Sequence, residues 1–155
     1  MPKMNKKLLA TIWIALGVIG RIIPHPANVT PMTGVALFGG AKLPRGMAFL
    51  VSFLALILSD IVLSWTDGHA AFGFWTLFTY SGFAAMVFAG SFLAKNDSAP
   101  RTLVLLIGSS LGFWLWTNFG TWLGGEMYPH TQSGLVACFV AAIPFLRNAM
   151  LGDLV

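Results

Sequence analysis

The sequence predicts an all-α integral membrane protein, and three observations carry that prediction. Of its 155 residues, 57% are hydrophobic and only 9% are charged, and the mean hydropathy is +0.80. Soluble domains, by contrast, carry about 25% charged residues. The apolar residues also fall into long runs bounded by proline, glycine and charge. Because a crossing helix uses about 20 residues, we expect one transmembrane domain over residues 1–155 and no soluble catalytic domain.

Six apolar segments define the expected helices, at about 8–23, 30–43, 46–65, 70–94, 102–123 and 133–150. The first follows a basic start like that of a signal peptide, but it lacks a small-x-small cleavage site and runs into Arg21 and Pro24, so we interpret it as a retained span. The second is short: at 1.5 Å per residue it reaches about 21 Å of a hydrocarbon core about 30 Å thick. It is therefore a thin or tilted partner in the bundle, or a re-entrant segment shielded by other helices.

The basic residues favour six crossings with both termini in the cytoplasm. In that topology only Arg21 lies outside, and the other basic residues lie inside: Lys3, Lys6, Lys7, Lys42, Arg45, Lys95, Arg101 and Arg147. If the second segment did not cross, only the three N-terminal lysines would remain inside, against the positive-inside rule. The same topology explains the net charge of +4 and the pI near 9.7 through contacts with anionic lipids. We expect no nucleic-acid partner, because the charges are dispersed.

Polar residues gather in the three connections that this topology places outside. They contain all three histidines, His25, His69 and His130, together with other polar side chains: Asn28, Asp67, Glu126 and Tyr128. The cytoplasmic connections hold mostly lysine and arginine. The sequence therefore predicts an outward-facing polar mouth.

Three polar residues inside the spans have similar predicted depths: Arg21, Asp60 and Asn118. A charge in the bilayer costs at least about 2.5 kcal/mol, so we expect Arg21 and Asp60 to face the interior and to pair. The pair is then either a structural lock between the first and third helices or a wall of an outward-facing cavity.

The fifth helix has two distinct faces at 100° per residue. One carries two small-xxx-small pairs that permit close helix packing: Gly108, Gly112, Gly120 and Gly124. The other carries Trp114, Asn118 and Trp122, an amide flanked by two indoles that could stack a flat ligand and hydrogen-bond its edge. Trp122 is equally typical of a residue at the membrane interface.

Cys138 is the only cysteine, near the expected depth of Asn118. It is either a small buried side chain or a thiolate ligand to a metal-containing substrate, with His25, His69, His130 or Met127 as further ligands.

The sequence contains none of the common catalytic motifs, such as Gly-x-Ser-x-Gly or His-Glu-x-x-His. Its nearest approach to a phosphate loop, Gly39-Gly40-Ala41-Lys42, lacks the first glycine, the following Ser or Thr and the preceding strand. We expect no enzymatic activity and no resident cofactor.

The chain resembles a small, uncharacterised family of bacterial inner-membrane proteins. The segments that carry the resemblance are RIIPHPAN at 21–28, ALFGGA at 36–41, LSD at 58–60, TNFG at 117–120, MYP at 127–129, PFLRN at 144–148, and Gly152-Asp153. These proteins are described as transport proteins similar to the substrate-binding S components of energy-coupling factor transporters. The resemblance implies a six-helix bundle that binds a vitamin or metal-related micronutrient from outside and delivers it with an ATPase module. Only Thr11 to Ala15 approximates the alanine-xxx-alanine docking patch of S components, which leaves solitary uptake open.

We therefore expect a multi-pass inner-membrane protein that binds a micronutrient on the periplasmic side, with cobalamin or another tetrapyrrole as first candidate. The expected substrate-binding residues are Arg21, His25, Asn28, Asp60, Trp114, Asn118 and Tyr128, with Asp67, Glu126 and His130 at the mouth. The expected partners are the small-molecule substrate, the lipid bilayer, and an energy-coupling module or a second copy. The main alternative is an assembly subunit that packs through the glycine face of the fifth helix; a membrane-embedded enzyme using Asp60, Glu126 or a histidine is the third.

Overall fold

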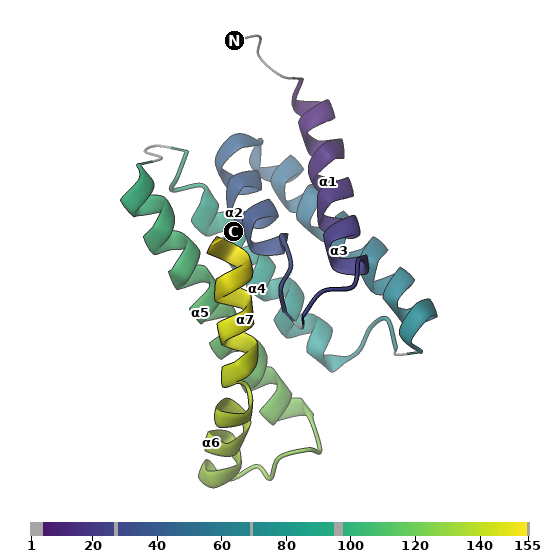
Figure 1. The fold of residues 1–155 in the computed structure, drawn as a ribbon, viewed down its shortest axis with the longest axis vertical. Coiled ribbons are helices and arrows are strands. Elements are labelled where there is room, and N and C mark those ends of the chain that lie inside the picture. Colours follow the sequence, from purple (N-terminus) through teal and green to yellow (C-terminus); the bar gives the residue numbers. More distant parts are fainter. Residues whose placement is uncertain (1–4, 27, 69, 95–97, 155) are drawn as a thin grey trace.

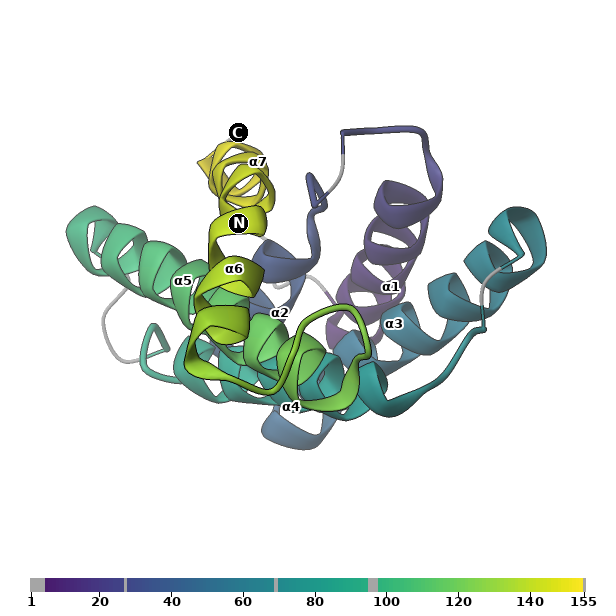
Figure 2. The same cartoon turned by 90° about the horizontal axis from the view of Figure 1, so that it is seen from below.

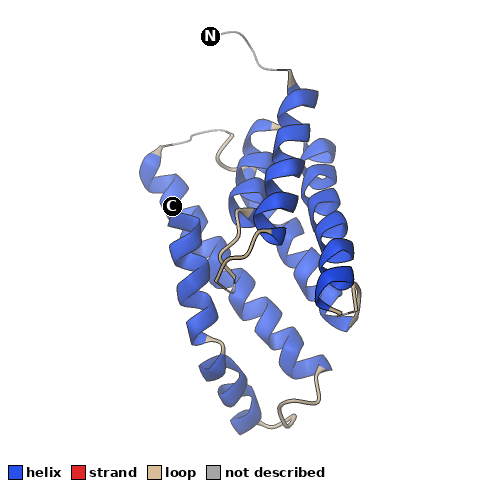
Figure 3. Ribbon diagram, turned by 45° about the vertical axis from the view of Figure 1, so that its right-hand side comes forward, coloured by secondary structure: helices blue, strands red, loops and turns tan. Residues whose placement is uncertain are grey.

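The computed structural model describes residues 5–26, 28–68, 70–94 and 98–154, and these residues form helices joined by loops, with no strand among them (Figure 3). The helices are α1 (Lys6–Ile22), α2 (Met32–Lys42), α3 (Arg45–Asp67), α4 (Phe74–Gly90), α5 (Ala99–Gly124), α6 (Gln132–Ala141) and α7 (Ile143–Leu154). The predicted all-α class is confirmed for this part of the chain. The second helix is short, as expected, at 11 residues.

Local chemistry explains where the helices begin and end. The side chain of Asn5 accepts a hydrogen bond from the backbone N–H of Lys7 and caps α1. Gly68 ends α3 in the left-handed region with φ of 72°, where glycine has no steric penalty. Thr76 accepts from the N–H of Gly73, so α4 begins at Phe74 and not near residue 70. At its other end α4 stops at Gly90, short of residue 94, because residues 91–94 form turns.

The last predicted helix, 133–150, is wrong as a single element. The chain bends by 41° between α6 and α7. Pro144 causes the break: it has no N–H to donate, and its ring would clash with the carbonyl four residues earlier, at Val140. Just before the break, the N–H of Ala142 bonds to the carbonyl oxygens of both Cys138 and Phe139.

The helices run alternately up and down the bundle, with α6 and α7 sharing one direction (Figure 1). Figure 2 shows α2 and α4 between two flanks, with α1 and α3 on one side and α5, α6 and α7 on the other. The main helix packing follows this order: α1 on α3, α2 on α4, and α4 on α5. The helix α7 packs on α5 and α6, and no substantial contact joins it to α1 among the described residues.

The core lies between α1, α2, α3 and α4 and combines alanines and valines with larger side chains such as Met32, Leu56 and Phe83. At the crossing of α2 and α4, a methyl group on Gly40 would overlap the carbonyl oxygen of Val87. A methyl group on Gly90 would overlap the carbonyl oxygen of Leu37. Glycine at both positions therefore lets the two backbones touch, as small residues do between membrane helices.

Two helices, α3 and α5, are long and apolar enough to cross a membrane, and the bent α6–α7 pair makes a third if it is one span. The α4 helix is also apolar, but has 17 residues. Large apolar side chains cover the outside of the bundle, including Leu16, Leu50 and Val104, each more than half exposed. A monomeric soluble protein rarely shows so much apolar surface, so this exterior is consistent with a membrane protein.

Candidate ligand-binding cavity

A polar cavity of about 310 Å³ lies among α1, α2, α4, α5 and α7. Four of the predicted site residues line it: Arg21, Asn28, Trp114 and Asn118. Its other polar lining comes from hydroxyls and one carboxylate: Thr30, Thr33, Thr79, Ser110, Thr117 and Asp153. Apolar lining includes Phe83, Phe113 and Phe145. The cavity thus combines hydrogen-bonding groups with aromatic surface, the composition of a small-molecule site.

The predicted ion pair between α1 and α3 is present. Arg21 Nη1 lies 2.7 Å from Asp60 Oδ1, and both side chains are less than one-fifth exposed. The same Nη1 donates to Ser59 Oγ at 2.7 Å. Tyr80 of α4 donates its hydroxyl proton to Asp60 Oδ2 at 2.9 Å. Arg21 is therefore held by two groups on α3, one of which is also tied to α4.

This pair stands between two cavities. Arg21 lines the polar cavity, whereas Asp60 lines a second cavity of about 350 Å³ toward the α3–α4 connection. Ser64 and Trp75 also line the second cavity. The structural and the cavity-wall interpretations of the pair are therefore compatible.

Asn28 enters the cavity from the α1–α2 connection, with φ of 65°. Asparagine is one of the few residues other than glycine that adopt this left-handed conformation readily. The following segment packs on α7, where a methyl group on Gly152 would lie 3.0 Å from Val29 Cγ1. The connection and α7 thus hold each other beside the cavity.

Trp114 and Asn118 face the cavity but already have hydrogen-bond partners. The indole N–H of Trp114 donates to the carbonyl of Ala142 at 2.9 Å, at the α6–α7 bend. The Asn118 amide donates to the carbonyl of Trp114 at 2.8 Å. Trp122 lies outside the cavity lining, and its indole donates to Pro129 in the α5–α6 connection at 2.9 Å. Of the two indoles predicted to flank Asn118 in the site, only that of Trp114 lines this cavity.

Asp153 is the most important lining residue that the site prediction lacks. Ser110 Oγ, buried on α5, donates to Asp153 Oδ2, and Thr33 of α2 is a second hydroxyl partner. The carboxylate therefore joins α7 to α5 and α2. In the sequence, Asp153 stands three residues beyond the last predicted helix and belongs to the Gly152-Asp153 segment of the family resemblance, so depth in the membrane does not mark it as it marks Asp60.

The remaining predicted residues lie away from the cavity lining. His25 Nδ1 is 2.8 Å from the carbonyl oxygen of Pro26, and Asp67 accepts from the Thr66 hydroxyl at the exposed end of α3. Three residues belong to the α5–α6 connection: Glu126, Tyr128 and His130, the last with its ring 5.6 Å from that of Trp122. His69, Lys3 and Lys95 fall outside the described residues.

Cys138 is buried, and its thiol lies 3.5 Å from the carbonyl oxygen of Asn118, at the depth that the sequence predicts. It does not line the cavity. Within the described ranges, no three His, Cys, Asp or Glu side chains come together in a way that could hold a metal ion.

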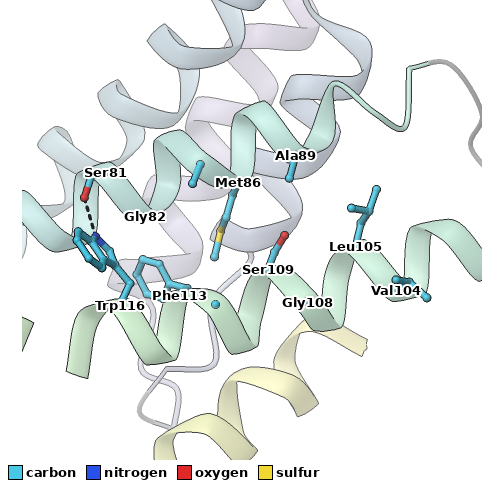
Figure 4. A pocket seen from close by; sticks show the side chains of 12 residues that line it. Ser81, Gly82, Met86, Ala89, Val104, Leu105, Gly108, Ser109, Phe113 and Trp116 are labelled. Carbon is cyan, nitrogen blue, oxygen red and sulfur yellow. Dashed lines mark hydrogen bonds between the residues drawn. The ribbon is translucent and has the colours of Figure 1, made fainter. Parts of the chain in front are cut away.

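An apolar groove of about 640 Å³ separates the upper parts of α4 and α5 (Figure 4). At one end, the indole of Trp116 donates to Ser81 Oγ at 2.8 Å. The four glycines predicted to share one face of α5 have two different surroundings. Gly120 and Gly124 pack under the rings of Phe78 and Phe74 of α4, whereas Gly108 and Gly112 have open space beside them.

Comparison with known proteins yields a family and no function. No curated protein and no solved structure matches the chain. The similarity to S components therefore stays a prediction from the residues. Residues 2–155 match the profile of a family of unknown function, DUF6580, and the chain belongs to that family.

Proposed function

We propose that the protein is a membrane transport protein that binds a micronutrient in the polar cavity and mediates its uptake. The observation that carries the proposal is the cavity itself: charged, hydroxyl and amide groups from five helices converge inside a bundle with an apolar exterior. Polar groups are costly at membrane depth and mark substrate or ion pathways when they are present.

The distribution of charge supports a six-span orientation, with α6 and α7 as one bent span. The upper end of the bundle in Figure 1 holds the start of α1, the end of α2 and the start of α3, which carry Lys6, Lys42 and Arg45. The lower end holds the end of α3, with Asp67, and the α5–α6 connection, with Glu126. Under the positive-inside rule, we assign the upper end to the cytoplasm and the lower end to the periplasm of a bacterial inner membrane.

The size of the cavity favours a compact substrate. At about 310 Å³ it lies at the lower end of the range of about 300–1,000 Å³ for ligand pockets. A tetrapyrrole macrocycle needs a larger site, and Cys138, which suggested a metal-containing substrate, does not line the cavity. We therefore favour a vitamin-sized compound with one or two rings over a corrinoid.

In this proposal, Trp114 and the neighbouring phenylalanines stack the substrate, and Asn28 and Asn118 bond to its edge. Arg21, fixed by Asp60, contributes a charged wall. Uptake is solitary or uses an energy-coupling module. The face of α1 between Thr11 and Ala15, where both residues are exposed, remains available for such a module or for a second copy.

Ligand retention by proteoliposomes tests the proposal. Purified full-length protein is reconstituted and incubated with a vitamin pool, and the retained compounds are quantified by mass spectrometry against empty liposomes. One molecule retained per protein indicates a binding component that needs a partner, and a clear excess indicates solitary uptake. Asn118→Ala should lose retention, whereas Trp122→Phe, on the same helix but outside the cavity, should keep it. No retention of any compound contradicts the proposal.

One observation favours the alternative of an assembly subunit. Gly108 and Gly112 border an open apolar groove that could receive a helix of a larger complex. Gly112→Leu would fill this groove without touching the polar lining at Asn118. If a co-purifying membrane protein is lost in Gly112→Leu while no compound stabilises the wild type, the assembly role is favoured. Unchanged ligand retention in the same variant favours transport.

A further inference from the structure

The balance of charge in the polar cavity points to the class of its ligand, an inference that rests on the proposed binding function. Two charged side chains line the cavity: Arg21 and Asp153. Arg21 is already neutralised, since Asp60 lies 2.7 Å from its Nη1. Counting that partner, the three groups carry a formal charge of −1 when the carboxyl of Asp153 is ionised.

Asp153 has hydroxyl partners but no cationic one in the part of the chain that the structure describes. Its carboxylate accepts from Ser110 and has Thr33 as a second partner. The one cation that lines the cavity, Arg21, pairs with Asp60. Asp153 is partly buried. An ionised carboxylate with reduced access to water is poorly stabilised by neutral donors alone, and a cation beside it would be favoured.

The other walls of the cavity suit the same kind of ligand. Trp114 and three phenylalanines line it, and aromatic faces attract cations, tryptophan most strongly. An anion would have to compete with Asp60 and Ser59 for Arg21 while lying in the same cavity as Asp153. The volume of about 310 Å³ limits the ligand to a compact molecule.

We propose that the cavity binds a small organic cation, a protonated amine or a quaternary ammonium. Asp153 holds its charge where α2, α5 and α7 meet, and Trp114 with the neighbouring phenylalanines holds its apolar body. Asn28 and Asn118 bond to polar substituents on that body. Asp153 is thus the residue that selects the charge of the substrate.

The test compares three probes of similar shape on the full-length protein in detergent: phenethylamine, phenylethanol and phenylacetate. They are cationic, neutral and anionic near neutral pH. Phenethylamine should raise the melting temperature in a concentration-dependent manner, and the other two should not. Because this comparison uses wild-type protein, it remains decisive if a variant fails to fold.

The matched variants are Asp153→Asn, which keeps the size of the side chain, and Asp67→Asn, which removes an exposed acid at the end of α3. Loss of a charge-assisted bond should weaken phenethylamine binding by about tenfold or more in Asp153→Asn. Asp67→Asn should bind like the wild type. Equal loss in both variants would show that the effect is non-specific and would overturn the assignment to Asp153.

The failure of this inference is distinguishable from failure of the proposed function. If phenylethanol or phenylacetate stabilises the protein as well as phenethylamine, the cation assignment is wrong and the cavity still binds ligands. The same holds if an anionic or neutral vitamin binds in an Asn118-dependent manner while phenethylamine does not. If neither the probes nor any vitamin binds, both the cation assignment and the binding function fail.

Discussion

Arg21 and Asp60 form an ion pair of 2.7 Å between α1 and α3, and each borders a different cavity. Ser59 and Tyr80 complete the network, so the guanidinium and the carboxylate each have a second partner. This arrangement keeps two charges inside an apolar bundle and fixes the position of the cavity wall at the same time.

Removing one member of this pair should destabilise the protein. Asp60→Ala leaves the Arg21 charge without its counterion, which we expect to cost up to about 3 kcal/mol, the lower end for a broken buried pair. Tyr80→Phe removes only one hydrogen bond and should cost about 1 kcal/mol. Thermal unfolding in detergent ranks the two variants, and an Asp60→Ala protein as stable as Tyr80→Phe would contradict the structural role.

The crossing of α2 and α4 should not tolerate a side chain at either of its contact glycines, Gly40 and Gly90. Gly90→Leu forces a side chain against the backbone of Leu37 and should lower the melting temperature strongly or abolish accumulation in the membrane. Gly46→Leu is the matched control, because open space surrounds Gly46. Membrane abundance and thermal unfolding of both variants check the prediction; equal behaviour would argue against the contact between the two helices.

The single cysteine reports on the α6–α7 bend. Cys138 is 2% exposed and lies beside the bend that the Trp114 indole holds through Ala142. Trp114→Phe removes this bond and should accelerate labelling of Cys138 by a membrane-permeant maleimide. Trp116→Phe removes an equivalent bond to Ser81 on α4 and should leave the labelling rate unchanged. Acceleration in both variants would indicate general loosening of α5 rather than release of the bend.

The membrane topology has a direct test at α2. At 1.5 Å per residue, its 11 residues extend about 16 Å, less than a bilayer core. We nevertheless expect a reporter fused after Arg45 to give a cytoplasmic signal, and one fused after Glu126 a periplasmic signal. A periplasmic signal after Arg45 would show that α2 does not cross, and the proposed orientation of the bundle would have to be abandoned.

The sequence predicts the helical class and the approximate helices because long apolar runs leave few alternatives. The Arg21–Asp60 pair is predictable as well, since two charges at similar depth in a bilayer stabilise each other. The bend at Pro144 is missed because apolar residues continue on both sides of it. The joining of Ser110 to Asp153 is also missed, because it spans 43 residues and depends on how α7 packs on α5. Hydroxyl residues such as Thr33 and Thr79 give no individual signal, since they become site residues only when helix packing brings them together.

The most direct test of a ligand-binding cavity is a thermal-shift screen of the purified full-length protein against vitamins and other micronutrients. A ligand that binds only the native state raises its stability by RT ln(1 + [L]/Kd). We predict a clear shift with a compact compound, its loss in Asn118→Ala, and its retention in Glu126→Gln, where the altered residue lies outside the cavity lining. No shift with any compound, or a shift that Asn118→Ala leaves intact, would contradict the account.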